Sequence, residues 1–451
     1  MNIKTIKEWI DNLSSSRKMI LGFLSSTIIG SFVLMLPFAL QEGETLNLLE
    51  SLFIITSAIC VTGLSVVDVS KVFTPAGQMV ILIFIQLGGL GVMTFSSLIF
   101  VIAGKRMTYE DRVVLKDERN ADDSEEISSF LKKIVYTVVF IESIGGILLT
   151  YIFMKELNFS FQKALFYGVF HSISAFCNAG FSLFTNGLEG FSQNIMLNLT
   201  ISYLIILGGI GFAVITSFVT VIRKDINRFN LTSKLAILIS IILTFGGTVL
   251  FLLMEYNNPS SIGDMGFLEK LTVSFFQSVT TRTAGFNTVP LANLESGTVF
   301  LFLILMFIGA SPGSAGGGIK TTTIGVIAFY VIGVVKGRKQ TELFNRRIGW
   351  EIINRAVSVL FLSILYISII TIIILTIESF DFEKVIFEVI SAFATVGLTL
   401  GITPDLHWFS KVLIIITMFV GRLGPLTFAL AIGESKKKEE YEYPKENILV
   451  G

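Results

Sequence analysis

The chain has 451 residues, of which 52% are hydrophobic and only 15% are charged. Soluble domains are about 45–50% apolar and about 25% charged, so this composition is that of a membrane protein and excludes a soluble enzyme. Lys plus Arg and Asp plus Glu both number 34, which leaves no basic excess for binding nucleic acid, and two cysteines are too few for a disulfide-stapled or zinc-ribbon protein.

Apolar stretches follow one another along the whole chain. They occupy 19–40, 79–103, 134–154, 196–222, 235–254, 299–310 with 324–335, 356–377 and 412–432. Most reach the roughly 20 residues that a helix needs to cross the hydrocarbon core of a bilayer. The first stretch is too long for the apolar core of a signal peptide, and no small-residue cleavage site follows it. The pattern therefore predicts eight spans, the sixth of them interrupted.

The connections between the spans fall into two sets that differ in basic residues. One set holds 25 of the 34 Lys and Arg residues and consists of 1–18, 104–133, 223–234, 336–355 and 435–451, whereas the opposite set holds six. Loops rich in Lys and Arg stay in the cytoplasm, and acidic residues contribute little to this rule. Both termini and the basic loops are therefore predicted to be cytoplasmic.

Each outer connection contains a short apolar segment of about 10–14 residues, too short to span and therefore predicted to be re-entrant. The four segments end in similar sequences that each contain one glycine: Gly63, Gly180, Gly285 and Gly397. A second glycine follows each of these after 24 to 28 residues, at Gly88, Gly208, Gly309 and Gly421. Glycines in membrane helices commonly serve close packing, but packing alone does not place four of them in register. These two glycine patterns recur together four times at nearly constant spacing, which indicates a fourfold internal repeat.

The fold class predicted from this repeat is an all-α polytopic membrane protein, in which four parallel helix–re-entrant pore hairpin–helix repeats surround a pseudo-fourfold central pore. Its parts are a cytoplasmic N-terminus (1–18), repeat 1 (19–104), repeat 2 (128–223), repeat 3 (232–336, with a broken helix at 309–320), repeat 4 (350–432) and a cytoplasmic tail (433–451). Every repeat begins in the cytoplasm, so the repeats are related by an axis along the membrane normal. The short helices direct their negative C-terminal ends at that axis, which favours a cation.

Backbone carbonyls around the repeated glycines are the candidate cation ligands, because irregular backbone at membrane depth must line a cavity and carbonyl rings replace the hydration shell of potassium. They belong to Val61, Thr62, Gly63, Asn178, Ala179, Gly180, Thr283, Ala284, Gly285, Thr395, Val396 and Gly397. The alternative is that each glycine only ends its helix, and the two roles are compatible.

The interrupted sixth span contains a segment that cannot remain helical, because Gly costs about 1 kcal/mol and Pro about 3 kcal/mol relative to Ala. We predict that it forms a gate together with Arg422, which replaces a glycine that the first two repeats keep. The segment consists of Gly309, Ala310, Ser311, Pro312, Gly313, Ser314, Ala315, Gly316, Gly317 and Gly318. An arginine at mid-membrane costs at least about 2.5 kcal/mol, which favours a functional role in bridging carbonyls of the segment. The alternatives are a harmless kink and a purely structural clamp.

Arg282 stands three residues before Gly285, inside apolar surroundings. We expect it to brace the filter from behind, paired with a carboxylate such as Glu388 or Glu50. The alternative is that the side chain of Arg282 lies in the ion path.

Cys60 and Cys177 occupy matching positions and are predicted to be small buried residues without a disulfide. His171 and His407 are isolated, so they predict packing or interfacial groups and no metal site. A membrane-embedded enzyme would need a cluster of His, Asp or Glu within the spans, where Glu142 is nearly the only carboxylate. An alternating-access transporter would need inverted repeats, and a scaffolding protein would not need four re-entrant segments.

At the four glycines, the broken sixth helix and Arg422, the chain resembles the Trk/Ktr/HKT superfamily of potassium transporters. The likeness covers nearly the whole chain. It is greatest for KtrB-type membrane subunits, because TrkH-type proteins have two extra helices before the first repeat and this sequence is not expected to form them. It implies potassium uptake across the bacterial cytoplasmic (inner) membrane, with potassium as the transported ion and no organic cofactor. It also implies a homodimer and a cytoplasmic nucleotide-binding regulatory ring (KtrA-like). The four filter sequences are unequal, so strict fourfold selectivity is not assumed, and sodium dependence stays open.

Overall fold

The computed structural model describes residues 15–91, 127–218 except 213 and 216, 230–426 except 339, and residues 428, 444 and 446. Helices make up most of these ranges, in which the only strands are the antiparallel pair β1 (Glu342–Leu343) and β2 (Arg346–Arg347). Three of the described helices are long and apolar enough to cross a membrane: Lys132–Leu157, Leu231–Glu255 and Trp350–Ile377. Most of the predicted N-terminus, most of the 104–133 loop and nearly all of the 433–451 tail lie outside the described residues.

The described helices repeat one order four times: a first helix, a short inner helix and a third helix. Unit 1 contains α2 (Ser15–Leu34), α3 (Leu48–Ile59) and α5 (Pro75–Leu90), and unit 2 contains α8 (Ile127–Leu157), α9 (Phe161–Phe176) and α10 (Ile195–Gly209). Unit 3 contains α12 (Leu231–Glu255), α13 (Phe267–Thr280), α14 (Ser296–Phe307) and α15 (Thr321–Val335). Unit 4 contains α16 (Trp350–Ile377), α17 (Phe382–Phe393) and α18 (Trp408–Leu423). Single turns occupy the connections: η1 (Pro37–Ala39), α4 (Val69–Val72), η2 (Glu189–Phe191) and η3 (Leu291–Asn293).

Local sequence signals explain where several helices begin. Asn47 and Glu50 form a capping box at α3, in which each side chain accepts a hydrogen bond from the other residue's backbone N–H. Thr74 caps α5 just before a proline at its first position, and Asn194 and Asn230 cap α10 and α12 through their side-chain oxygens. These caps satisfy backbone donors that a helix start leaves free.

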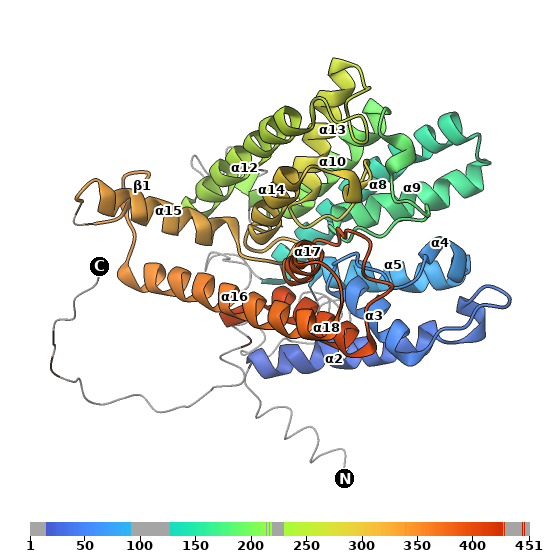
Figure 1. Cartoon of the computed structure of the whole chain (residues 1–451), viewed down its shortest axis with the longest axis horizontal. Helices are drawn as coiled ribbons and strands as arrows, with labels where there is room; N and C mark the ends of the chain where they lie inside the picture. The colour runs from blue at the N-terminus through green and yellow to red at the C-terminus, as the bar shows by residue number, and fades with distance from the viewer. Residues whose placement is uncertain are drawn as a thin grey trace, which may run out of the picture.

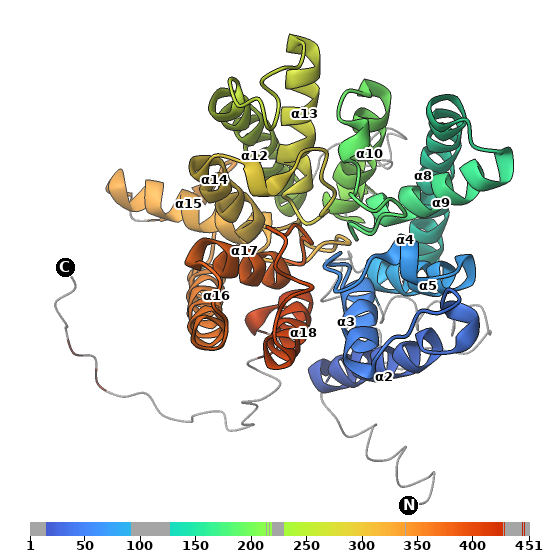
Figure 2. The ribbon, with the colours of Figure 1, turned by 45° about the vertical axis from the view of Figure 1, so that its right-hand side comes forward.

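The four units form a closed ring. The third helix of each unit packs against the inner helix of the next, in the pairs α5 with α9, α10 with α13, α14 with α17, and α18 with α3. The last pair returns to unit 1, so the ring has no open end. Figure 2 shows the four units as blue, green, yellow and orange-red blocks around a common centre, and Figure 1 shows α17 near that centre in the other view.

Burial follows the position of each helix in the ring. The inner helices carry fully buried phenylalanines, such as Phe53, Phe276 and Phe387, whereas α8, α12 and α16 expose large apolar side chains on their outer faces. Phe361 of α16, for example, is 65% exposed. Apolar surface of this extent is compatible with contact to lipid rather than to water.

The third helices of units 1, 2 and 4 are interrupted where the sequence predicts continuous spans, and residues 92–103 of the first of these spans lie outside the described residues. Continuous spans over 79–103, 196–222 and 412–432 were expected, but the helices end at Leu90, Gly209 and Leu423. Each ends next to or near a glycine with positive φ: Gly91 at +83°, Gly211 at +98° and Gly424 at +88°. A glycine adopts this conformation without steric cost and thereby ends the helix. Together with the loop between α14 and α15, these glycines give each of the four units a break in or after its third helix.

Candidate ion-binding site

The segment after each inner helix has an unusual backbone that is the same in all four units. Val61, Asn178, Thr283 and Thr395 have positive φ angles of 51°, 56°, 72° and 51°. The glycine two residues later also has positive φ, from 69° at Gly180 to 93° at Gly397. A β-branched residue in this region costs about 1–3 kcal/mol, and three of the four are β-branched. Strain that recurs at four matching positions points to a functional backbone.

The inner helices hold the N–H groups of these segments. The N–H groups of Thr62, Ala179 and Val396 each donate to the carbonyl of a serine in the preceding helix, at 2.8 Å. These serines are Ser57, Ser174 and Ser391, and Thr280 takes the same place in unit 3 with the N–H of Ala284 at 3.0 Å.

The hydroxyl groups of the same four residues make a second hydrogen bond to the backbone of each glycine-containing segment. Ser57 Oγ and Ser391 Oγ accept from the N–H groups of Gly63 and Gly397, at 3.0 and 3.1 Å. Ser174 Oγ and Thr280 Oγ1 instead donate to the carbonyls of Phe181 and Phe286. These hydroxyl residues are not among the predicted site residues, although each stands five or six residues before a repeated glycine, a spacing that is visible in the sequence.

The four glycines meet in a closed circle. A Cβ atom added to Gly63 would lie 2.5 Å from the carbonyl oxygen of Ala179, and one added to Gly180 would lie 2.7 Å from that of Ala284. A Cβ atom on Gly285 would meet the carbonyl oxygen of Val396, and one on Gly397 would meet that of Thr62. Each glycine thus abuts the next unit in the same direction, and the last abuts the first. Only glycine fits at these four contacts.

The carbonyl oxygens of the twelve predicted ligand residues have no hydrogen-bond donor among the described residues. Nine of these twelve residues are buried, and Gly63, Gly180 and Gly285 are partly buried. Ten of the twelve N–H groups of the same residues donate to the preceding inner helix, and those of Gly180 and Thr283 have no acceptor among the described residues, so the free groups are mainly acceptors. A ring of free acceptors suits a cation and no anion.

The segment of unit 3 between α14 and α15 contacts the glycine-containing segments of units 3 and 4. The N–H of Gly317 donates to Thr395 Oγ1 at 3.0 Å, and a Cβ atom on Gly316 would meet Thr283 Oγ1. On its other side the segment is fastened to the end of α10: Ser311 N donates to Gly209 O at 3.0 Å and Ala315 N to Gly208 O at 3.2 Å. The broken helix is therefore an ordered loop that reaches from unit 3 to units 2 and 4.

Arg422 on α18 connects the loop to unit 1. Its Nη1 donates to the carbonyl of Ala315 in the loop, and its Nη2 donates to the carbonyl of Gly88 at the end of α5. Lys320 is a second cation here, and its Nζ donates to the carbonyl of Gly316 at 2.8 Å. Two basic side chains thus contact backbone carbonyls of the loop.

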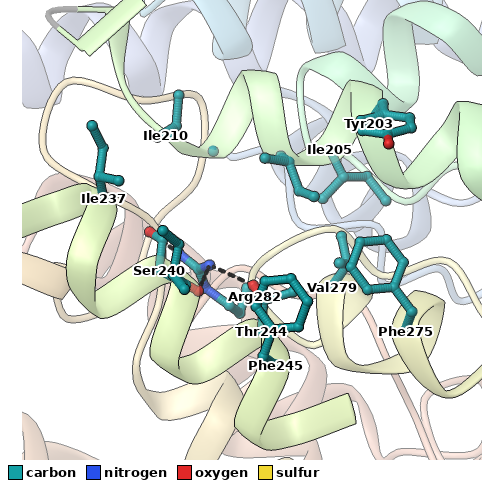
Figure 3. Close-up of a pocket in the computed structure, with 13 residues that line it drawn as sticks. Tyr203, Ile205, Ile210, Ile237, Ser240, Thr244, Phe245, Phe275, Val279 and Arg282 are labelled. Atoms are coloured by element: carbon teal, nitrogen blue, oxygen red, sulfur yellow. Dashed lines mark hydrogen bonds between the residues drawn. The ribbon is translucent and has the colours of Figure 1, made fainter.

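Arg282 does connect the segment before Gly285 to α12, but its predicted pairing with a carboxylate is wrong. Its guanidinium donates to the carbonyl and hydroxyl of Ser240 at 3.3 and 2.9 Å and to Thr244 Oγ1 at 3.2 Å, all on α12 (Figure 3). Glu388 instead accepts from Thr399 and Thr403, and Glu50 belongs to the cap of α3. Hydroxyl and carbonyl oxygens of the neighbouring helix replace the expected ion pair.

The other singled-out residues are packing groups. Cys60 and Cys177 are free and buried, as predicted. His171 is buried between the carbonyl of Tyr167 and the hydroxyl of Ser182, and His407 accepts at the start of α18. The described residues contain no group of three His, Cys, Asp or Glu that could hold a metal ion.

The outer connections of units 2 and 3 are tied together beside the ring. Asn287, two residues after Gly285, donates from Nδ2 to Glu189 Oε1 at 2.7 Å, and its carbonyl accepts from the N–H of Leu188. Burial raises the pKa of Glu189 and outweighs this hydrogen bond, which lowers it. These hydrogen bonds join the outer connections of units 2 and 3 close to Gly285.

Comparison with known proteins gives one consistent result. The model of the TrkH family, described as cation transport protein, matches residues 13–441. The chain is 38% identical over 448 residues to the Ktr system potassium uptake protein B of Bacillus subtilis, covering 99% of both chains. It is 36% identical over 439 residues to the potassium/sodium uptake protein NtpJ of Enterococcus hirae, covering 95% of this chain and 96% of the relative. The crystal structure of the potassium transporter TrkH from Vibrio parahaemolyticus is similar with a TM-score of 0.71 at 18% identity, covering 93% of this chain and 85% of that one.

Proposed function

This chain belongs to the TrkH family of cation transport proteins, and from that membership we propose that it takes up potassium through a pore enclosed by its four units. It is a potassium and cation transport protein of the membrane, not an enzyme. The narrowest part of the pore is the ring of Gly63, Gly180, Gly285 and Gly397.

One observation carries this proposal: twelve clustered carbonyl oxygens have no donor among the described residues, whereas ten of the twelve N–H groups of the same residues are bonded to the inner helices. A buried carbonyl without a partner costs about 1–3 kcal/mol. A cation that has shed its water restores those interactions, which is how potassium filters work. The strained backbone at Val61, Asn178, Thr283 and Thr395 supports the same interpretation, because such strain is retained where it serves a function.

The loop 309–320 and Arg422 form the gate in this proposal. The loop touches the filter at Thr395 through Gly317, and Arg422 fixes it to unit 1. A positive charge at about 6 Å from the ion repels it by about 3 kcal/mol at an effective dielectric constant of about 20. Moving the loop or the guanidinium would remove that barrier, so these contacts support a gating role for the loop and Arg422.

The assembly and its orientation belong to the same proposal. We propose that the chain forms a homodimer in the bacterial cytoplasmic membrane, with both termini in the cytoplasm and a nucleotide-binding regulatory ring of KtrA-like subunits beneath it. Three relatives are named as proteins of a Ktr system, which supports a partner subunit. The hairpin of β1 and β2 supports the inner face as a docking surface, because Arg346 and Arg347 are exposed there.

Tracer flux into liposomes tests the proposal. The purified chain is reconstituted in potassium-loaded vesicles, and rubidium uptake is measured with the chain alone and together with a Ktr-type nucleotide-binding subunit. We expect uptake above that of protein-free vesicles, competed by potassium more strongly than by sodium. Uptake equal to that of protein-free vesicles under both conditions would contradict the function.

A further inference from the structure

A crevice between units 2 and 3 is not explained by ion transport. It has a volume of about 250 Å³ and lies between α10 and α12, with the end of α13 and Arg282 at its inner side (Figure 3). Tyr203, Ile241 and Phe245 line it and are 60%, 50% and 61% exposed, so it opens on the apolar outer face of the protein. In a membrane, that face is covered by lipid chains.

Arg282 gives the crevice an uncompensated positive charge. Its hydrogen bonds go only to neutral oxygens of Ser240 and Thr244, and no carboxylate of the described residues pairs with it. Its buried Nε has no acceptor, so the guanidinium uses fewer than its five donors. Buried charges in proteins are normally paired with an opposite charge. The missing partner is therefore an anion.

The lining and the depth of the crevice select the class of anion. Apart from Arg282, Ser240, Thr244 and the hydroxyl of Tyr203, the lining side chains are apolar, which suits a hydrocarbon chain. Ser240 lies nine residues into α12, about 13.5 Å along the helix from its cytoplasmic end. A phospholipid head group stays at the interface, about 15 Å from the middle of a bilayer core of about 30 Å. A carboxylic acid can sink deeper, because it can shed its charge by binding a proton and regain it beside a cation.

We propose that this crevice binds the carboxylate end of a long-chain fatty acid from the surrounding bilayer, paired with Arg282, while its tail lies between α10 and α12. Planar guanidinium and carboxylate groups pair through parallel hydrogen bonds. The site lies outside the ring of glycines, so it does not depend on the proposed ion path. Arg282 stands three residues before Gly285, so an occupant of the crevice contacts the residue that links the Gly285 segment to α12.

Fluorescence quenching by a brominated fatty acid tests this binding. The variant Tyr203→Trp, reconstituted in liposomes, places a reporter at the mouth of the crevice, and dibrominated stearic acid is compared with its methyl ester. We expect the acid to quench the added fluorescence at about tenfold lower concentration than the ester. A tenfold gain in affinity is at the lower end of what one charge-assisted hydrogen bond contributes to binding. The matched control is Phe140→Trp on the lipid-facing side of α8, where the acid and the ester should quench alike.

Two second-site changes locate the binding. Arg282→Gln in the Tyr203→Trp protein should abolish the preference for the acid, and Arg282→Lys should retain part of it. Ile237→Phe fills the crevice without altering the hydrogen bonds of Arg282, and it should also abolish the preference, which decides the matter if Arg282→Gln does not fold. Equal quenching by acid and ester in Tyr203→Trp, or a preference that survives the filled crevice, would overturn the proposal. Stronger quenching by a brominated phosphatidylglycerol than by the acid would overturn the fatty-acid assignment.

Discussion

Replacing the ring glycines one at a time by serine should relax the discrimination between potassium and sodium to different degrees. Real Cβ atoms essentially never approach another atom closer than 3.0 Å. A Cβ atom on Gly180 at 2.7 Å therefore requires a movement of about 0.3 Å, and one on Gly63 at 2.5 Å requires about 0.5 Å. Gly285 and Gly397 are closer still to the next carbonyl. Gly180→Ser should be the mildest of the four substitutions, and Gly285→Ser and Gly397→Ser the most severe.

The size of the effect follows from the backbone. A residue other than glycine in the left-handed region costs about 1–2 kcal/mol, in addition to the clash. If the strand relieves this strain by shifting its carbonyls, selectivity falls by about 5- to 30-fold. The assay is competition of sodium against rubidium uptake in liposomes, normalised to the amount of folded protein.

Gly401 offers a matched control. It shares the φ angle of +93° with Gly397 and lies four residues away, but a Cβ atom there meets nothing within 4 Å. Gly401→Ser therefore carries the same backbone strain without touching the ring, and selectivity should stay unchanged. If Gly401→Ser and Gly397→Ser altered selectivity equally, or if none of the four ring substitutions did, the assignment of the filter would be wrong.

Three further predictions concern the gate and the assembly. Arg422→Ala, or deletion of Gly316–Gly318, should raise basal flux per folded molecule, up to about 100-fold if a barrier of about 3 kcal/mol is removed. Either change should also make the flux depend less on the partner subunit. A well-folded variant with unaltered flux would refute the gating role. Thr395→Val removes the acceptor of the Gly317 N–H and should raise basal flux by only about two- to tenfold, while Thr399→Val, which leaves the loop untouched, should not. Deleting 445–451 should weaken the dimer in native mass measurements in detergent, because the apolar end of the tail, 448–451, is expected to be buried at the dimer contact; an unchanged mass would contradict this.

Much of the architecture could be predicted from local patterns. The four inner helices follow from short apolar segments before Gly63, Gly180, Gly285 and Gly397, because such segments are too short to span and too apolar for loops. The breaks at Gly91, Gly211 and Gly424 were missed, because an apolar run gives no sign of where its backbone turns. Only the accumulation of glycine with proline at 309–318 was strong enough to reveal a break.

Long-range partners could not be predicted in the same way. Arg282 was assigned a carboxylate because charge pairing is the simplest rule for a buried arginine, yet Ser240 and Thr244 on α12 supply neutral oxygens instead. Likewise, the contact of Arg422 with Gly88 joins residues 334 positions apart and uses a backbone carbonyl, which every residue has. Sequence identifies the donor in such cases, but the acceptor depends on how the ring closes.

The central claim, that the carbonyls of the glycine ring hold the transported ion, is tested most directly by locating the ion. A crystal structure of the protein in rubidium or thallium should show an anomalous peak on the axis of the ring, surrounded by carbonyl oxygens of all four units. The same crystals of Gly397→Ser should show that peak weakened, whereas crystals of Gly401→Ser should retain it. A ring without a peak, together with ordered ions elsewhere in the protein, would contradict the account.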